Sequence, residues 1–246
     1  MKNLKIIIST VERPNKTPYL DRIIKSIRKD WSGDIHLMIG GKNTQYTDKY
    51  KKNYIKHYVD EEGLKNNIQK AAQGYFEALT LDPNNPALIF EDDGELVPGW
   101  FSKLETRLSY ISEEKFILSL ITPGEGTVPI PDVNIPSVQK YVYAAYLSYD
   151  TPGYPVSTVI TYCNTTGIYY PPSILKTRLA EFIQKFSVNG DAVYDTVVGQ
   201  YMFRHNLPVY ITVPNLLKGV DSDDSSLGHV KRPSTVDYSD WDYTKL

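Results

Sequence analysis

Residues 87–100 read ALIFEDDGELVPGW, and they join a short apolar run to three consecutive carboxylates, Glu91, Asp92 and Asp93. The run 87–90 has the length and composition of a buried β-strand. Adjacent carboxylates repel each other and lose hydration where such a strand leaves the core, so they cost free energy unless a partner neutralises them. A bound cation is the partner that this arrangement predicts.

Strands and helices alternate on both sides of this motif. The expected strands are residues 4–9, 34–40, 54–59, 87–90, 116–122, 156–170 and 207–214, and the expected helices are residues 17–30, 63–81, 98–111, 171–186 and 191–205. Such alternation predicts an α/β fold of the Rossmann-like type, with a mostly parallel central sheet and helices on both faces. In that architecture ligands bind beyond the carboxyl ends of the strands, where residues 9–10 and 91–93 are expected to lie.

The helices carry start signals and apolar faces of their own. Thr17 is the expected N-cap of the first helix and Pro18 its first helical residue. Leu20, Ile23, Ile24 and Ile27 share one face of that helix. The second helix has its expected apolar stripe at Leu64, Ile68, Ala71, Tyr75 and Ala78.

Composition restricts the class of protein. The chain of 246 residues carries 27 Lys and Arg against 29 Asp and Glu, so its net charge of -2 gives no global attraction to a polyanion. Its single cysteine, Cys163, excludes an intramolecular disulfide framework and suits a reducing compartment. No segment has the roughly 18 apolar residues of a membrane span, so we expect a soluble, cytoplasmic protein. The sequence leaves the oligomeric state open.

Three segments carry a family resemblance: STVERP at 9–14, LIFEDD at 88–93 and PNLLKGVDSDDSSLGH at 214–229. Together with the order of elements, they resemble the GT-A glycosyltransferases, which use nucleotide sugars and carry a DxD-type motif where Glu91, Asp92 and Asp93 stand. The resemblance implies a single GT-A-like domain. Residues 1–122 would form its nucleotide-sugar-binding half, 123–214 an acceptor-side half with an insertion, and 215–246 an irregular C-terminal tail over the active site.

The resemblance also implies roles for individual residues. Asp93 is the first choice as ligand of a Mn²⁺ or Mg²⁺ ion, and Asp92 or Glu91 would hydrogen-bond the ribose or donor sugar, with Asp92 a possible second metal ligand. The third metal ligand is open between Asp221 and His229. The remaining expected contacts to a nucleotide-sugar donor, with UDP as the expected nucleotide, come from Thr10, Val11, Arg13, Asn67, Lys218, His229 and Lys231.

A catalytic base is expected at the start of the helix that follows Gly190. Asp191 and Asp195 lie one helical turn apart there, and Asp191 is the better candidate for taking the proton of an acceptor hydroxyl. Capping of the helix N-terminus explains an aspartate at this position equally well.

The acceptor and the competing functions stay open. A glycan, a protein or a hydroxymethylated base of viral DNA would each supply a hydroxyl group, and the composition suits a viral or bacterial protein. For DNA, residues 41–58 form a basic and aromatic patch. A sugar nucleotidyltransferase shares the element order but needs a glycine-rich loop after the first strand, and STVERPNKTP contains no glycine. A non-catalytic nucleotide or sugar binder is the alternative of another class.

Overall fold

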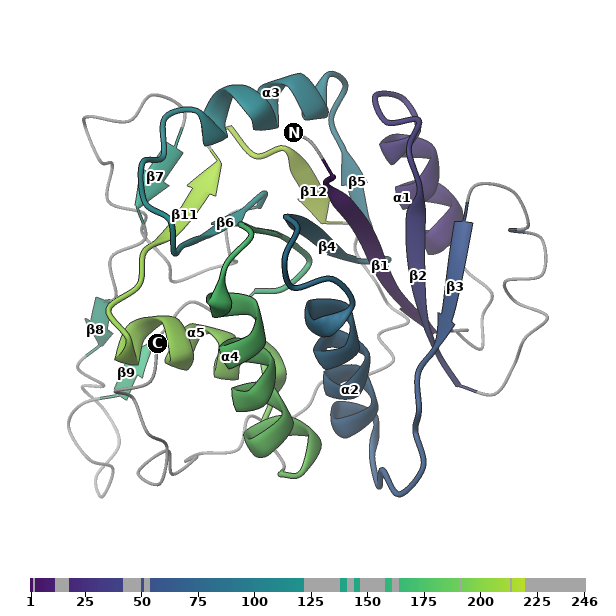
Figure 1. The fold of residues 1–246 in the computed structure, drawn as a ribbon, viewed down its shortest axis with the longest axis vertical. Coiled ribbons are helices and arrows are strands. Elements are labelled where there is room, and N and C mark those ends of the chain that lie inside the picture. The colour runs from purple at the N-terminus through teal and green to yellow at the C-terminus, as the bar shows by residue number, and fades with distance from the viewer. Residues whose placement is uncertain are drawn as a thin grey trace.

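The computed structural model describes residues 1, 3–11, 18–41, 50, 54–121, 164–190, 192–212 and 214–219, and the backbone alone of 138–140, 144–146 and 158–160. Within this part, a mostly parallel sheet runs through the molecule in the order β3-β2-β1-β4-β10-β6-β11-β7 (Figure 1). β10 and β7 run antiparallel to their neighbours. The strands of this sheet are β1 (Lys5–Val11), β2 (Ile35–Gly40), β3 (Tyr54–Tyr58), β4 (Ala87–Glu91), β6 (Ile117–Ser119), β7 (Val138–Lys140), β10 (Gly167–Tyr170) and β11 (Val209–Thr212).

Helices cover both faces of the sheet, as the sequence predicted. On one face, α1 (Tyr19–Ile27) and α3 (Trp100–Leu108) pack over a core that includes Ile6 and Ile8 of β1. On the other face, Ile7 belongs to the core under four helical segments: α2 (Asn67–Thr80), α4 (Ile174–Ile183), the π-helical turn η2 (Gln184–Val188) and α5 (Tyr194–Arg204). Successive residues of β1 therefore serve opposite cores, because side chains alternate along a strand.

The helix faces confirm part of the sequence pattern. In α1 the four predicted residues, Leu20, Ile23, Ile24 and Ile27, are all buried. In α2 the predicted Tyr75 and Ala78 are buried, but the stripe is centred on Ala72 and Leu79, and Leu64, Ile68 and Ala71 are only half-buried. The stripe is displaced because α2 packs against α4 and η2 as well as the sheet.

Several element starts differ from the sequence prediction. α1 begins at Tyr19 with Pro18 at its N-cap, and α2 begins at Asn67, because the side chain of Asn66 caps it by accepting the Gln69 N–H at 2.9 Å. α5 begins at Tyr194, so the prediction that the helix includes Ala192 and Val193 is wrong. The single strand predicted at 156–170 is two: β9 (Thr158–Ile160) pairs with β8 (Ala144–Tyr146), and β10 joins the main sheet.

The tail predicted to be irregular begins with a strand. β12 (Leu217–Gly219) pairs antiparallel with β5 (Gly94–Leu96), which follows the acidic motif directly. Leu217 fits there because Gly94 and Gly167 have no side chains: a Cβ at either position would approach its methyl carbons to 2.8 or 2.7 Å. This close approach places the start of the tail beside the acidic turn.

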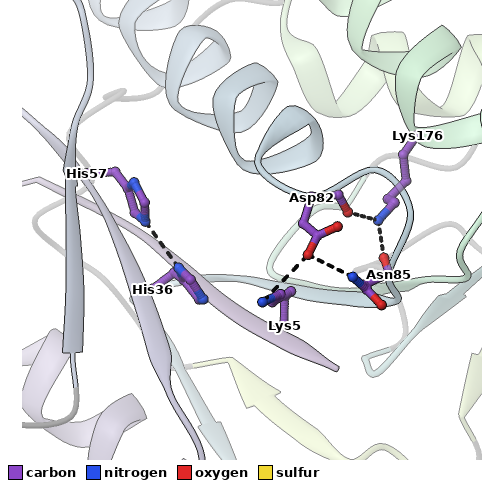
Figure 2. Close-up of polar contacts among 6 residues, drawn as sticks. All are labelled: Lys5, His36, His57, Asp82, Asn85 and Lys176. Atoms are coloured by element: carbon purple, nitrogen blue, oxygen red, sulfur yellow. Dashed lines mark hydrogen bonds and ion pairs between the residues drawn. The ribbon is translucent and has the colours of Figure 1, made fainter. Parts of the chain in front are cut away.

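A buried lysine holds the loop that leads into β4. Lys176 of α4 is fully buried, and its ammonium donates to the carbonyl oxygens of Asp82, at 2.7 Å, and Asn85 (Figure 2). Burial lowers the pKa of Lys176 to about 8. Lys5 of β1 forms an ion pair with the Asp82 carboxylate at 3.5 Å. These contacts tie the amino end of β4 to β1 and α4. Within the described residues, no helix has the length and apolar character needed to cross a bilayer.

Candidate active site

The acidic motif lies at the carboxyl edge of the sheet. β1, β2 and β4 are parallel neighbours, so their last residues, Val11, Gly40 and Glu91, end at the same edge. The antiparallel strand β10 begins there, and the Glu91 N–H donates to the carbonyl of Thr166 at 3.0 Å. Open α/β sheets bind ligands beyond this edge, so a ligand site is expected here.

Asp92 is turned toward β1. Its residue is almost fully buried, with 2% of its surface exposed, and its Oδ2 accepts a hydrogen bond from the Thr10 hydroxyl at 2.6 Å. Thr10 and Asp92 were predicted to serve the same ligand, and the structure places them in direct contact. This hydrogen bond connects the end of β1 to the turn that follows β4.

Glu91 is turned toward the second half of the chain. Its Oε1 accepts hydrogen bonds from the Thr165 hydroxyl at 2.6 Å and from the Tyr194 hydroxyl at 2.5 Å. Tyr194 is the first residue of α5, and its ring packs on Tyr75 of α2 with centroids 5.1 Å apart. Glu91 and Asp92 therefore turn to different partners, because neighbouring side chains at a strand end point in opposite directions.

The carboxyl group of Glu91 has a strongly perturbed pKa. The residue is half-buried, and protein atoms surround its carboxyl group. Burial first, and then the negative charges of Asp93 and Asp195, raise its pKa to about 7, although the two hydroxyl donors oppose the shift. Burial also raises the pKa of Tyr194 well above its ordinary value. Perturbed carboxyl groups of this kind are concentrated at catalytic and binding sites.

Asp93 and Glu91 supply oxygen ligands of the kind that hard divalent cations take. Their mutual repulsion, visible in the raised pKa of Glu91, is the condition that a bound cation relieves. The described residues contain no group of three His, Cys, Asp or Glu side chains that could hold a metal. A Mg²⁺ ion that also binds substrate phosphates needs only one or two carboxylates, so the acids present fit such an ion.

The other predicted site residues are distributed unevenly. Val11 ends β1 next to Thr10 and is half-buried, and Lys218 is exposed on β12, where its backbone lies opposite Glu95. The remaining predicted residues lie outside the part of the chain that is described: Arg13, Asp191, Asp221, His229 and Lys231. Their roles stay predictions.

Asn67 borders the apolar stripe expected for the second helix, which predicts that its side chain faces inward, and this prediction is wrong. Asn67 is exposed at the first position of α2, because the helix starts later than predicted and turns its packed face elsewhere. Gln69 is the buried amide of this helix. Its Nε2 donates to the Gly190 carbonyl at 3.1 Å and its Oε1 accepts the Lys65 N–H at 2.7 Å, so it links α2 to the residue before position 191.

Two residues near the acidic motif, Thr165 and Tyr194, were not given a site role from sequence, and Asp195 was only the weaker candidate for the base. Thr165 and Tyr194 bind Glu91, and Asp195 adds charge to it. Tyr194 and Asp195 lie in the segment GDAVYD (190–195), which the sequence predicts to carry the catalytic base. Asp191 was preferred there as the base. Thr165 follows Asn164 in a polar stretch with no signal that separates it from an ordinary surface threonine.

Comparisons with protein-family models and with curated protein sequences find no match to this chain. Solved structures do share its fold. A putative glucose-1-phosphate thymidylyltransferase from Bacillus anthracis, in complex with a sucrose, matches with a TM-score of 0.51 and 14% identity over 88% of this chain and 89% of its own. S. aureus TarS 1-349 matches with a TM-score of 0.55 and 14% identity over 88% of this chain and 60% of its own.

A third match is the inositol-1-phosphate CTP transferase from T. maritima, with a TM-score of 0.53 and 11% identity over 89% of both chains. At these identities the likeness concerns the fold alone. The chain therefore has the Rossmann-like α/β fold, with a mostly parallel sheet flanked by helices, that the sequence predicted.

Proposed function

We propose that the protein is a metal-dependent glycosyltransferase that transfers a sugar from a nucleotide-sugar donor, with UDP as the expected nucleotide, to a hydroxyl group of an acceptor. The observation that carries this proposal is the Thr10–Asp92 hydrogen bond of 2.6 Å at the carboxyl edge of β1 and β4, with Glu91 and Asp93 beside it. Nucleotides bind at this edge in open α/β sheets. A purely structural strand end has no need for three acids at that point.

The donor would lie across the end of β1. Thr10 and Val11 would contact the nucleoside, and Asp92 would orient the ribose or the donor sugar. Asp93 would hold the Mn²⁺ or Mg²⁺ ion, together with Asp92 or with a ligand from the tail at Asp221 or His229. When bound, such an ion neutralises the charge that the departing nucleoside diphosphate gathers.

The acceptor would approach from the side of α5. Its hydroxyl oxygen forms the new bond to the anomeric carbon as the bond to the diphosphate breaks, and its proton passes to a carboxylate base. Asp191 is the proposed base. Asp195 is the alternative base. The charge of Asp195 acts on Glu91, so Asp195 lies near the acidic motif. Glycans, proteins and hydroxymethylated DNA bases all offer such a hydroxyl group, and the net charge of -2 does not favour DNA.

The comparisons favour a second candidate, a sugar nucleotidyltransferase, because two of the three matched structures carry that activity in their names. Such an enzyme joins a nucleoside triphosphate to a sugar phosphate and releases pyrophosphate. Residues 9–18 contain no glycine, whereas the pyrophosphate-binding loop of such an enzyme needs glycine so that its backbone can turn tightly against the phosphates. The glycosyltransferase proposal therefore stands first.

One experiment separates these functions. Metal-stripped protein is incubated with a panel of nucleotide sugars, with and without Mn²⁺, and with glycan, peptide and hydroxymethylated DNA acceptors, and the products are read by mass spectrometry. We expect donor consumption that requires Mn²⁺. Pyrophosphate release from a nucleoside triphosphate and a sugar phosphate would instead establish the nucleotidyltransferase, and donor binding without turnover would establish a binder.

The matched control for the acidic motif is Glu95→Gln. Glu95 is a half-buried acid on β5, two residues after Asp93 and opposite Lys218. The proposal requires that Asp93→Asn abolishes Mn²⁺-dependent turnover while Glu95→Gln retains it. Equal losses of activity in both variants would show that the total negative charge at this edge supports turnover, and not one particular metal ligand.

A further inference from the structure

We propose that His36 and His57 form a second metal site, a two-imidazole site for a borderline transition-metal ion of the Zn²⁺ type, separate from the acidic motif. His36 lies on β2 and His57 on the neighbouring parallel strand β3. The register pairs His36 with Ile55 and Met38 with His57, so the two histidines are diagonal neighbours on one face of the sheet. Figure 2 shows their rings meeting between the two strands.

The ring nitrogens are at chelating distance. His36 Nδ1 and His57 Nε2 lie 3.1 Å apart. Two nitrogens bound to one tetrahedral Zn²⁺ at about 2.0–2.1 Å lie about 3.3 Å from each other, so a bound ion needs the nitrogens to separate slightly and each ring to turn until its lone pair points at the ion. The ring planes are inclined by 20°, and the centroids lie 5.4 Å apart, which keeps both nitrogens directed at the space between the rings.

Without metal, one of these nitrogens donates its N–H to the other. Metal binding requires a lone pair on both. A neutral imidazole carries one proton on either of its nitrogens, so the donor ring can place its proton on the other nitrogen without a net gain or loss. The hydrogen-bonded pair thus converts to a chelating pair by a change of tautomer.

The surroundings keep both rings neutral, the form that binds metal. Burial lowers the pKa of His36 to about 4, with smaller contributions from His57 and Lys5, and burial also lowers the pKa of His57. Carboxylates nearby offset part of these effects: they are Asp34 and Asp82 around His36, and Glu77 of α2 around His57. Around His36 the positive charge of Lys5 opposes these carboxylates, so Glu77 near His57 is the acid that favours a cation between the strands.

Imidazole nitrogen selects the metal class. It suits Zn²⁺, Cu²⁺ and Ni²⁺, whereas Mg²⁺ and Mn²⁺ prefer carboxylate, carbonyl and water oxygens. Two protein ligands leave the further coordination positions to water, since the described residues place no third His, Cys, Asp or Glu side chain at this pair. Because β3 is the edge strand of the sheet, an ion at this pair would join the edge strand to β2.

The test uses untagged, metal-stripped protein and Zn²⁺ alone as the probe, titrated by calorimetry in the presence of excess Mg²⁺. We expect one Zn²⁺ per chain at the histidine pair, and at least tenfold weaker binding in His57→Asn and in His36→Asn. His57 lies on the edge strand and is half-buried, so its variant is expected to fold. His205→Asn, which changes a histidine after α5, is the matched control and should bind as the wild type does.

Zinc at the acidic motif is distinguished by Asp93→Asn, which would remove that ion and leave the one at the histidines. NMR of the imidazole nitrogens gives an independent reading, since His36 Nδ1 and His57 Nε2 should both shift on Zn²⁺ addition while His205 does not. The proposal is overturned if His57→Asn and His36→Asn bind Zn²⁺ as tightly as the wild type does. It is also overturned if the wild type binds no more Zn²⁺ than His57→Asn does. In either case the pair is only a hydrogen bond.

Discussion

Acidification should weaken the fold through His36. The folded protein holds the pKa of His36 at about 4, against 6.5 for the ordinary side chain, because the ring is buried and only 8% exposed. The unfolded chain therefore takes up a proton on this ring below pH 6.5, whereas the folded protein does so only near pH 4. Stability that is present above pH 6.5 is lost as the pH falls toward 4.

The size of the effect follows from the two pKa values. One pKa unit corresponds to about 1.4 kcal/mol, so the full shift from 6.5 to about 4 represents about 3.4 kcal/mol. Between pH 7 and pH 5 the unfolded ring becomes almost fully charged while the folded ring stays mostly neutral. The expected loss of unfolding free energy from His36 over that interval is about 2 kcal/mol.

Glu91 acts in the opposite sense. Its pKa is raised from 4.5 to about 7 in the folded protein, so the folded state binds its proton first and gains about 2 kcal/mol over the same interval. The two effects nearly cancel in the wild type, so His36 and Glu91 together should change its unfolding free energy little between pH 7 and pH 5. His36→Leu should become more stable at pH 5 than at pH 7, and Glu91→Gln less stable, relative to the wild type.

Urea denaturation at pH 7 and pH 5, in chelator to keep both metal sites empty, measures these differences. Each variant serves as the control for the other, because they change the pH dependence in opposite directions. If His36→Leu and the wild type show the same change in unfolding free energy within about 0.5 kcal/mol, burial does not hold His36 neutral and the reasoning is refuted.

Three further predictions concern the candidate active site. Asp93→Asn should keep less than about a tenth of metal-dependent turnover, a barrier increase of at least about 1.4 kcal/mol, in a steady-state assay with Mn²⁺. Asp191→Ala should lower transfer roughly 10²- to 10⁴-fold with nucleotide affinity within a few-fold, and NMR of the product's anomeric proton should show inversion; retention, or near-normal turnover, would exclude it as the base. Tyr194→Phe should cost about 1–2 kcal/mol of unfolding free energy by removing a 2.5 Å donor to Glu91, whereas an unchanged urea midpoint would contradict that bond.

Local pattern was enough to predict β4, the helices on both faces and the edge at which the acids lie, but not β5, β7, β8 or β12, and it merged β9 with β10. The apolar run 87–90 forms β4 and ends at Glu91, and the face of α1 is buried as its spacing predicts. Such features depend on residues a few positions apart. The spacing of the apolar residues among them indicates which side of a strand or helix is buried. Helices on both faces of a mostly parallel sheet followed from the alternation of these elements.

The orientation of the acids required the tertiary structure. Asp92 turns to Thr10, 82 residues away, and Glu91 turns to Thr165 and Tyr194, 74 and 103 residues away. These partners are ordinary hydroxyl side chains whose sequence neighbours give no sign of a distant carboxylate. Only the insertion of β10 beside β4, and the packing of α5 on α2, bring them within hydrogen-bonding distance.

The histidine pair and the tail strand depend on register in the same way. His36 meets His57 only because β3 pairs with β2 in one particular alignment, and a shift by one residue would send the His57 ring to the other face. β12 is held to β5 by Leu217 filling the space above two glycines, a fit that no local pattern encodes. Sequence determines which segments form strands and helices, and long-range packing decides which side chains those elements bring together.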